Sequence, residues 1–457
     1  MPASLSAWYG TQYASWGDAM IGRGKRVLFP TILVALALVT TEGVSHLVIR
    51  LSRPLFAEEI RTTRAIFREQ SDRIRRLIAP DASRMLSVDS VLGWRYSAGH
   101  HDAANTISSQ GLRGARQYSA HPRPGVARVA AFGDSFVYGS EVADSAAWSA
   151  IMERLFPQLE VLNYGVGGYG VDQAYLRFRA EGRALAPQLV IIGFTTDDLR
   201  RVVNVYRRFI SNRELPLVKP RFTLDTLGRL VLLPEPLTHA SDYARYLRAP
   251  RDIIELGTND YWYQPAIYRD PLYDHSATVR LLTHLWLGIH RRYFAGDRLI
   301  RHGEFAPTSA AFQIQIALFE HFAAAVRSIG ARPVVVIFPD RESVAEAREG
   351  RRTVLAPVIQ AVAARGLEYI DLTRAFLDRE APGDVTGWFM SGGHYSLSGN
   401  RVVAEWLGRE MVMRALSGPG HQVLRGGHAT GIGGTPETAA TAGSTTNSGP
   451  SSGAPPR

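Results

Sequence analysis

The sequence predicts an α/β protein with a doubly wound, mostly parallel sheet, an inserted subdomain and an N-terminal transmembrane helix. Short apolar runs recur along the chain, and most are followed by a longer segment with helical periodicity. This alternation is typical of parallel strands joined by crossover helices. A separate, uncharged apolar segment near the N-terminus predicts the transmembrane helix.

The N-terminal region divides by charge and hydrophobicity. Residues 27–49 form the predicted membrane anchor, provided that Glu42 lies at the interface. A signal peptide is the alternative, but no small-residue cleavage site follows cleanly. The basic residues before the span predict a cytoplasmic segment over 1–26, although arginines on the other side oppose this orientation.

Two smaller elements follow the anchor. Residues 50–87 carry apolar side chains at roughly helical spacing, which predicts a juxtamembrane helical stalk. Residues 88–125 predict a small β element, which either rims a site or packs as a lid on the sheet edge. The His100-His101 pair in this segment is expected to be a surface loop, since no third ligand lies at metal-binding spacing.

The core is expected over residues 126–416. Strands are predicted at 127–132, 159–163, 188–193, 332–338 and 367–371 because these runs are apolar and bounded by turn residues. Helices are predicted at 145–156, 171–184, 309–329, 352–365 and 397–415.

Residues 200–308 interrupt this pattern and predict an insertion. The segment is rich in arginine and then in aromatic residues, which suit either a substrate cap or an ordinary core. It contains a Gly-x-Asn-Asp sequence ending at Asn259 and Asp260, interpreted as a loop because no convincing buried strand precedes it. Residues 417–457 are rich in Gly, Ser, Thr, Ala and Pro and are expected to be disordered.

Composition excludes several classes of function. The chain has no cysteine, so disulfides and thiolate metal sites are excluded, and neither a metal nor another cofactor is expected. The net charge is +10, but the basic residues are scattered and almost all arginine, which argues against nucleic-acid binding. An anionic membrane surface or acidic polysaccharide fits the charge better.

A candidate nucleophile follows the first predicted core strand. The chain passes through Gly133 and Asp134 to Ser135 and enters a helix, so Ser135 would face the crevice at the carboxyl edge of the sheet. Its backbone N–H, near a helix N-terminus, could stabilise a developing negative charge. Downstream, glycine-rich and acidic turns follow the next two strands, and His394 precedes the last helix.

This ordered set of motifs resembles the SGNH (GDSL-type) hydrolases, over about residues 126–416, with Gly133-Asp134-Ser135-Phe136 as the most specific block. The resemblance implies a flavodoxin-like three-layer fold and an extracytoplasmic catalytic domain anchored in the cytoplasmic membrane. It implies that Ser135 is the nucleophile and first oxyanion donor, that Gly168 supplies a second backbone N–H, and that His394 is the base. The family's oxyanion asparagine aligns with Asp197.

Two positions depart from the family pattern. Asp197 can donate to an oxyanion only if burial raises its pKa enough to keep it protonated. Ser391 stands where the family has the acid that orients the histidine. A Ser–His dyad is therefore expected, with His394 oriented by a backbone carbonyl or by another acid such as Asp384. Asp134 and Asp198 are assigned supporting roles beside these groups.

The expected function is that of a serine esterase acting on ester-linked acyl groups, with envelope glycans or lipids as the expected substrates. The same acyl-enzyme would make the protein an O-acyltransferase if a sugar hydroxyl replaced water. A non-catalytic binding module on the same scaffold is the third alternative. The expected partners are an acylated carbohydrate or lipid ester and the membrane, with no nucleic acid.

Overall fold

The computed structural model describes residues 14–51, 60–79, 81, 84–234, 237–294, 296–380 and 384–417. Part of the expected cytoplasmic segment, residues 1–13, lies outside the described residues. The expected disordered tail also lies outside them from residue 418 onward.

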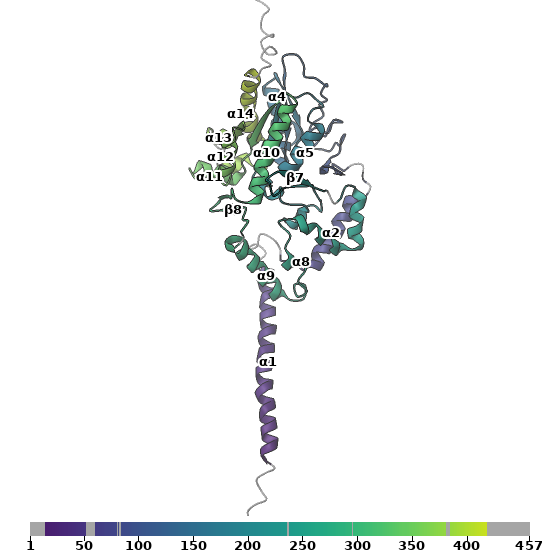
Figure 1. Ribbon diagram of the computed structural model, residues 1–457, viewed down its shortest axis with the longest axis vertical. Coiled ribbons are helices and arrows are strands. Elements are labelled where there is room, and N and C mark those ends of the chain that lie inside the picture. Colours follow the sequence, from purple (N-terminus) through teal and green to yellow (C-terminus); the bar gives the residue numbers. More distant parts are fainter. Residues whose placement is uncertain are drawn as a thin grey trace, which may run out of the picture.

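A five-stranded parallel sheet forms the centre of the molecule (Figure 1). In space the strands follow the order β11-β10-β5-β3-β4, which is the 2-1-3-4-5 order of flavodoxin-like folds when the five are numbered along the chain. The predicted doubly wound α/β fold is confirmed. The five strands are β3 (Ala127–Phe132), β4 (Leu159–Asn163), β5 (Leu189–Phe194), β10 (Arg332–Ile337) and β11 (Tyr369–Asp371).

Helices cover both faces of this sheet because alternate strand residues point to opposite sides. Ala130 and Phe132 of β3 pack in a cluster with one helix layer, whereas Val129 and Ala131 pack with the other. The first layer contains α5 (Val171–Glu181), α10 (Ala310–Ser328) and α12 (Ala356–Ala364). The second contains α4 (Trp148–Leu155), α11 (Arg341–Arg348), α13 (Thr373–Leu377) and α14 (Leu397–Leu416).

The five predicted core helices are present within a few residues of their expected bounds. The short helices α11 and α13 were not predicted from the sequence. Each occupies a connection, after β10 and β11 respectively, and is too short to show clear periodicity.

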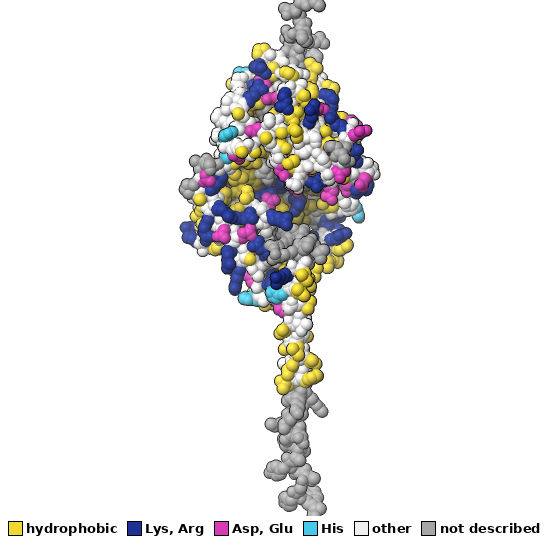
Figure 2. Space-filling view, turned by 180° about the vertical axis from the view of Figure 1, so that it is seen from behind, with side chains coloured by type: hydrophobic (Ala, Val, Ile, Leu, Met, Phe, Trp, Pro, Cys, Tyr) yellow, Lys and Arg dark blue, Asp and Glu magenta, His cyan; other side chains and the backbone are white. Residues whose placement is uncertain are grey.

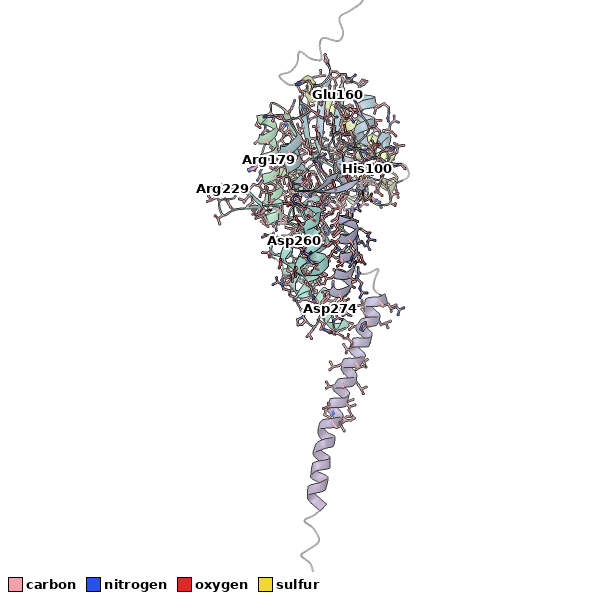
Figure 3. The ribbon with its side chains drawn as sticks, turned by 90° about the vertical axis from the view of Figure 1, so that its right-hand side faces the viewer. His100, Glu160, Arg179, Arg229, Asp260 and Asp274 are labelled. Atoms are coloured by element: carbon pink, nitrogen blue, oxygen red, sulfur yellow. The ribbon has the colours of Figure 1, made fainter. Side chains whose placement is uncertain are left out.

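The expected stalk helix is present as α2 (Thr63–Ile78), but it packs against the insertion. Phe67 and Ile74 of α2 are buried in a third hydrophobic cluster with tyrosines of the insertion. The carboxylate of Asp274 accepts hydrogen bonds from the backbone N–H of Thr63 at 2.6 Å and its hydroxyl at 2.7 Å. Asp260 and Asp274 lie in the half of the molecule nearer α1, whereas Glu160 lies at the far end (Figure 3).

The insertion between β5 and α10 is built mainly of short elements. They are α6 (Asp198–Arg201), η2 (Arg207–Phe209), β6 (Arg221–Leu224), β7 (Leu230–Leu233), η3 (Ala240–Ala244), α7 (Arg245–Arg248), η4 (Pro250–Asn259), α8 (Pro265–Tyr268), α9 (Ala277–Ile289), η5 (His290–Phe294), β8 (Ile300–Arg301) and β9 (Glu304–Phe305).

The N-terminal helix α1 (Ala14–Leu51) extends away from the body of the molecule (Figure 1). Its segment Leu28–Leu51 has 24 residues with a mean hydropathy of 2.0, so it is long and apolar enough to cross a bilayer. Apolar side chains are visible along the described part of this stem (Figure 2). Near its end, Glu42 accepts hydrogen bonds from Ser276 Oγ at 2.7 Å and Thr278 Oγ1 at 2.8 Å, which ties α1 to the start of α9.

Candidate active site

The candidate nucleophile lies where the sequence places it, at the carboxyl end of β3. Asp134 caps the short helix α3 (Ser135–Tyr138) by accepting a hydrogen bond from Phe136 N at 2.9 Å. Ser135 is the first residue of this helix and is 7% exposed. Its hydroxyl lies 3.5 Å from Asp134 Oδ2. Between the described residues Ser135 and His394 no hydrogen bond is formed, which is common before a substrate aligns such a pair.

The candidate oxyanion donors are the backbone N–H groups of Ser135 and Gly168. Among the described residues, neither the N–H of Ser135 nor that of Gly168 donates to another group. Ser135 is at the first position of its helix, where the N–H has no intrahelical partner. Gly168 has φ +79°, a conformation that favours glycine over residues with a Cβ.

The small β element holds the loop that carries Gly168. In the hairpin of β1 (Leu86–Asp89) and β2 (Gly93–Tyr96), the Tyr96 hydroxyl accepts a hydrogen bond from Gly167 N at 2.9 Å. Trp94 Nε1 donates to Gly167 O at 3.1 Å. Both backbone polar groups of Gly167 are therefore bound by β2, and this element supports the candidate oxyanion loop.

Glu141 orients the candidate base. His394 Nδ1 lies 2.7 Å from Glu141 Oε2, and because an ionised carboxylate can only accept, Nδ1 carries the proton. Nε2 is then left as the acceptor that could take a proton from a nucleophile. The same carboxylate accepts the backbone N–H groups of Gly392 and His394, each at 3.0 Å.

Glu141 occupies an unusual backbone position. Its φ is +68°, which is uncommon for a residue with a side chain and costs on the order of 1 kcal/mol. Burial opposes its ionisation, but the hydrogen bonds from His394 and Gly392 outweigh burial and lower the pKa of Glu141. A Cβ on Gly392 would lie 2.2 Å from Glu141 Oε1, so Gly392 leaves room for the carboxylate.

This arrangement corrects the expected orientation of the histidine. Asp384 caps η6 (Val385–Trp388), with its carboxylate accepting from Thr386 N at 2.7 Å, and does not contact His394. Ser391 is exposed. The sequence missed Glu141 because it follows the nucleophile by six residues rather than preceding the histidine. The turn around residue 141 is needed to bring the two together.

Burial does not keep Asp197 protonated, so the condition under which it could donate to an oxyanion is not met. Its side chain is 55% exposed and lies 3.2 Å from Arg201 Nη2. The Arg201 guanidinium lowers the pKa of Asp197 and outweighs the opposing desolvation. Smaller lowering contributions come from Arg200, Arg207 and His394. Asp197 is thus an ionised acceptor and cannot replace the family's donor.

The two supporting acids form a buried network around the same arginine. Arg201 Nη1 donates to Asp134 Oδ2 at 2.8 Å and lies 3.5 Å from Asp198 Oδ1. Asp198 also accepts the N–H of Thr195 at 2.8 Å. Burial, and then the charge of Asp134, raise the pKa of Asp198 well above its usual range. Among the acids around Arg201, Asp198 rather than Asp197 therefore has the raised pKa.

Arg207 is a second group that the sequence did not reveal. Its Nη2 would lie 3.8 Å from a Cβ built on Gly168, and it pairs with Glu214 at 2.8 Å. The residue is 3% exposed, and its Nη1 has no hydrogen-bond partner among the described residues. A buried cation with an unused donor thus lies beside the candidate oxyanion loop. Only the fold of the insertion brings it there.

The Gly-x-Asn-Asp sequence of the insertion is structural. The sequence predicted a loop here, but Asn259 is the exposed last residue of the 3-10 helix η4. Asp260 is buried and accepts backbone N–H groups of Val205 at 2.6 Å and Tyr206 at 2.9 Å. Burial raises the pKa of Asp260 to about 6 despite these bonds. Its role is to hold the segment that leads into Arg207.

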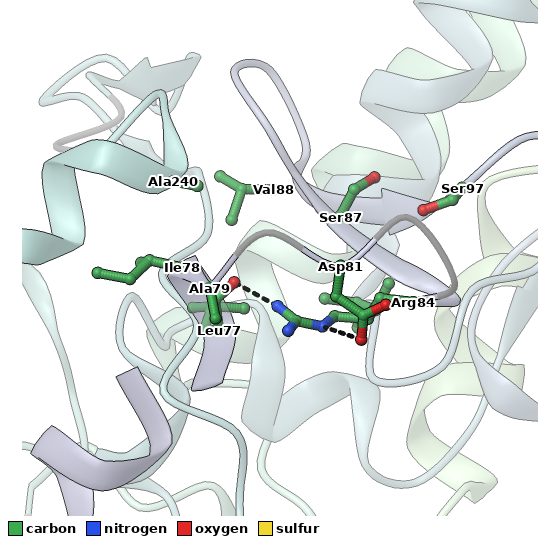
Figure 4. Close-up of a pocket in the computed structure, with 10 residues that line it drawn as sticks. Leu77, Ile78, Ala79, Asp81, Arg84, Ser87, Val88, Ser97 and Ala240 are labelled. Carbon is green, nitrogen blue, oxygen red and sulfur yellow. Dashed lines mark hydrogen bonds and ion pairs between the residues drawn. The ribbon is translucent and has the colours of Figure 1, made fainter. Parts of the chain in front are cut away.

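Within the described residues, no group of three or more His, Cys, Asp or Glu side chains could hold a metal ion. His100 Nε2 lies 3.2 Å from Asp102, and His101 Nδ1 lies 3.1 Å from Thr106 Oγ1. A cavity of about 350 Å³ between α2 and β1 is lined mainly by apolar atoms (Figure 4). Its Arg84 donates to Leu77 O at 2.6 Å and pairs with Asp81, so the cavity contains no group resembling a nucleophile–base pair.

No protein-family model and no curated protein matches the chain. Among solved structures, a lipolytic protein of the G-D-S-L family from Desulfitobacterium hafniense is similar at 16% identity and a TM-score of 0.29, covering 62% of this chain and 98% of its own.

Two further solved structures are a lipase/acylhydrolase from Enterococcus faecalis and a catalytic mutant of an acetylxylan esterase from Geobacillus stearothermophilus. The first shows 15% identity and a TM-score of 0.30, covering 63% of this chain and 97% of its own. The second shows 12% identity and a TM-score of 0.32, covering 63% of this chain and 95% of its own. The names agree with the resemblance of the motifs, but similarities this low carry no argument about activity.

Proposed function

We propose that the protein is a serine esterase of the SGNH type. The observation that carries the proposal is the combination of Ser135 on a strand-to-helix turn, the N–H groups of Ser135 and Gly168 without an acceptor among the described residues, and a histidine oriented by a carboxylate. These are the parts that acyl transfer through a serine requires. The base is therefore positioned by Glu141 rather than acting in a dyad.

The proposed reaction has two steps. The Ser135 hydroxyl attacks the ester carbonyl while His394 Nε2 takes its proton, and the N–H groups of Ser135 and Gly168 bind the oxyanion. The proton then passes from His394 to the departing alkoxide, which leaves an acyl-serine. Water, deprotonated by His394, attacks this ester and releases the acid. The same intermediate could transfer the acyl group to a sugar hydroxyl.

The proposed substrates are acylated glycans or lipids of the cell envelope. Support comes from the proposed anchor α1, which would hold the site near a membrane, and from the motifs that resemble the SGNH hydrolases. We place the body of the molecule outside the cytoplasmic membrane on the same grounds.

The test is hydrolysis of p-nitrophenyl acetate by the full chain in detergent. Ser135→Ala and His394→Ala should each lower kcat by at least about 10³-fold, and Ser135→Ala should also abolish labelling by a fluorophosphonate. Ser140→Ala is the matched control, since it removes a hydroxyl five residues further along the chain, just after α3. Absence of labelling on the folded wild-type chain would instead favour a binding module. Labelling without hydrolysis would favour a transferase.

A further inference from the structure

An exposed apolar face runs along α9, where the body of the molecule meets α1 (Figure 1). Its large side chains are between 43% and 61% exposed, and they are Leu282, Leu285, Trp286 and Ile289 of α9, followed by Tyr293 of η5. The four in α9 lie at the three- and four-residue spacing that puts side chains on one side of a helix. Arg280 and Leu287, on the opposite side, are buried, so α9 packs on the body by that side.

Contacts with α1 fix the position of this face relative to the apolar segment. Thr278 lies one turn before Leu282 on the same side of α9, and its Oγ1 is 2.8 Å from Glu42 Oε2 and 3.0 Å from Ser45 Oγ. The apolar face therefore begins on the side of α9 that contacts α1. Glu42 lies nine residues before Leu51, where the apolar segment ends, which is about 14 Å along the helix.

A bilayer crossed by α1 reaches this level of the molecule. Crossing takes about 20 apolar residues. A span that begins at Leu28 therefore ends beyond Glu42. The side chains of α1 remain apolar and exposed there, since Leu47 is 54% and Leu51 is 69% exposed. The start of α9 then lies at the depth of the lipid rather than above it.

Glu42 has the partners that a carboxylate at this depth needs. Charged side chains within a membrane are costly unless other groups bind them. Glu42 accepts hydrogen bonds from Ser276 Oγ at 2.7 Å, from Thr278 N at 3.2 Å and from Ala277 N. These donors belong to the N-terminus of α9, so the helix that carries the apolar face also satisfies the carboxylate of the span.

We propose that the exposed face of α9 lies in the lipid–water interface, as a second membrane contact beside α1. Interfacial helices present an apolar face of this kind to the lipid, and Trp and Tyr residues such as Trp286 and Tyr293 concentrate at head-group level. The inference rests on the proposed anchor and is independent of the proposed catalysis. A second contact would hold the body in one orientation above the membrane, whereas a single helix would let it tilt.

The absence of cysteine from the chain allows a nitroxide label to be placed at one chosen residue at a time. Leu282→Cys, Leu285→Cys and Ile289→Cys are labelled separately in the full chain, which is reconstituted in vesicles of phosphatidylcholine and phosphatidylglycerol. Collision of each label with oxygen, which concentrates in lipid, and with a water-soluble nickel chelate gives its depth. At least two of the three labels should lie about 5 Å or more below the phosphate level.

Two further exposed leucines are the controls. Leu38→Cys reports on α1 itself, and Leu227→Cys, in the β6–β7 turn, should remain in water. Arg229 of that turn lies well away from α1 (Figure 3).

Each result decides the proposal. Lipid contact at Leu38 with water contact at two or more of the α9 positions would overturn it and leave the anchor intact. Water contact at Leu38 would overturn the anchor and the proposal together. Shielding of the α9 labels from both reagents, with dipolar broadening between labels on different chains, would identify a second copy of the protein as the occupant and would also overturn the proposal.

Discussion

Single carboxylates at the site have different roles because their neighbours differ. Glu141 faces an imidazole and two N–H groups, Asp197 faces Arg201 near solvent, and Asp198 is buried beside Asp134. Glu141 and Asp197 have a lowered pKa, whereas Asp198 has a raised pKa. Residue identity alone therefore does not indicate which acid orients the base.

Glu141→Gln is expected to lower kcat with little change in KM. Glutamine can still accept a backbone N–H, but its amide cannot stabilise the imidazolium that forms when His394 takes the proton. A loss of about 10²- to 10⁴-fold is expected by analogy with other triads. Asp384→Asn is the matched control and should stay within about twofold. Equal losses in both variants would show that Glu141 does not orient the base.

Asp197→Asn is expected to change hydrolysis only modestly, with a rise in kcat of less than about tenfold. The carboxylate is already paired with Arg201, so removing its charge relieves little repulsion of an oxyanion. Ester turnover across several substrate concentrations measures this effect. A loss of 100-fold or more would instead assign Asp197 a role of its own.

At the scale of elements, β2 positions the loop between β4 and α5, which lies about 70 residues further along the chain. Tyr96 and Trp94 bind both polar backbone groups of Gly167, and Tyr169 Oη donates to Trp94 O at 2.5 Å. The loop between β4 and α5 is therefore held from outside the five-stranded sheet. Its geometry depends on a hairpin that precedes the core in the chain.

Tyr96→Phe should lower kcat about tenfold while leaving the fold intact. The change removes the acceptor of the Gly167 N–H and lets the neighbouring Gly168 donor move away from the oxyanion. Tyr118→Phe is the control, because its buried hydroxyl bonds Glu153 and Val161 away from the glycine loop. The kcat of each variant is compared with that of the wild type, and the thermal stability of each variant is measured alongside. Equal falls in both variants would indicate a general loss of stability.

At the scale of the whole molecule, two arrangements join the N-terminal helices α1 and α2 to the body. Glu42 of α1 receives hydrogen bonds from the start of α9, and Glu69 of α2 pairs with Arg61, Arg73 and Arg208. Through Glu69, α2 is tied to η2 of the insertion. The body is thus connected to the proposed anchor by packed elements.

The Glu69 pairs make stability depend on pH. Burial disfavours the carboxylate, but the hydrogen bond from Arg61 and the charge of Arg208 outweigh it and lower the pKa of Glu69 to about 2. Because the folded pKa lies below the unfolded value, the stabilisation is complete above about pH 4.5 and is lost as pH falls toward 2.

Glu69→Gln should therefore lower the free energy of unfolding by about 2 to 3 kcal/mol at pH 7, and the difference from wild type should shrink below about pH 4. Denaturant unfolding of the full chain in detergent between pH 3 and 7 measures this. Asp72→Asn, which removes an exposed pair with Arg75, should change stability by less than about 0.5 kcal/mol. A Glu69 effect that stays constant with pH would contradict the assignment.

The sequence by itself determined the features that depend on local pattern. Buried parallel strands read as apolar runs, so β3, β4 and β5 and the turn at Ser135 could be predicted almost to the residue. Motifs after β4 and before α14 pointed to Gly168 and His394, whose roles stay predictions. The apolar segment of α1 was evident from hydropathy alone.

Only the tertiary structure decided which distant groups meet. Glu141 contacts His394 across 253 residues of chain, and Asp260 holds the segment before Arg207 from 54 and 55 residues away. Neither contact leaves a periodic signal in the sequence. Asp197 and Asp198 both lie near Arg201, and their pKa values differ because the side chain of Asp197 is exposed whereas Asp198 is buried beside Asp134. Local pattern reflects backbone periodicity, whereas proton positions and charge depend on contacts that the fold creates.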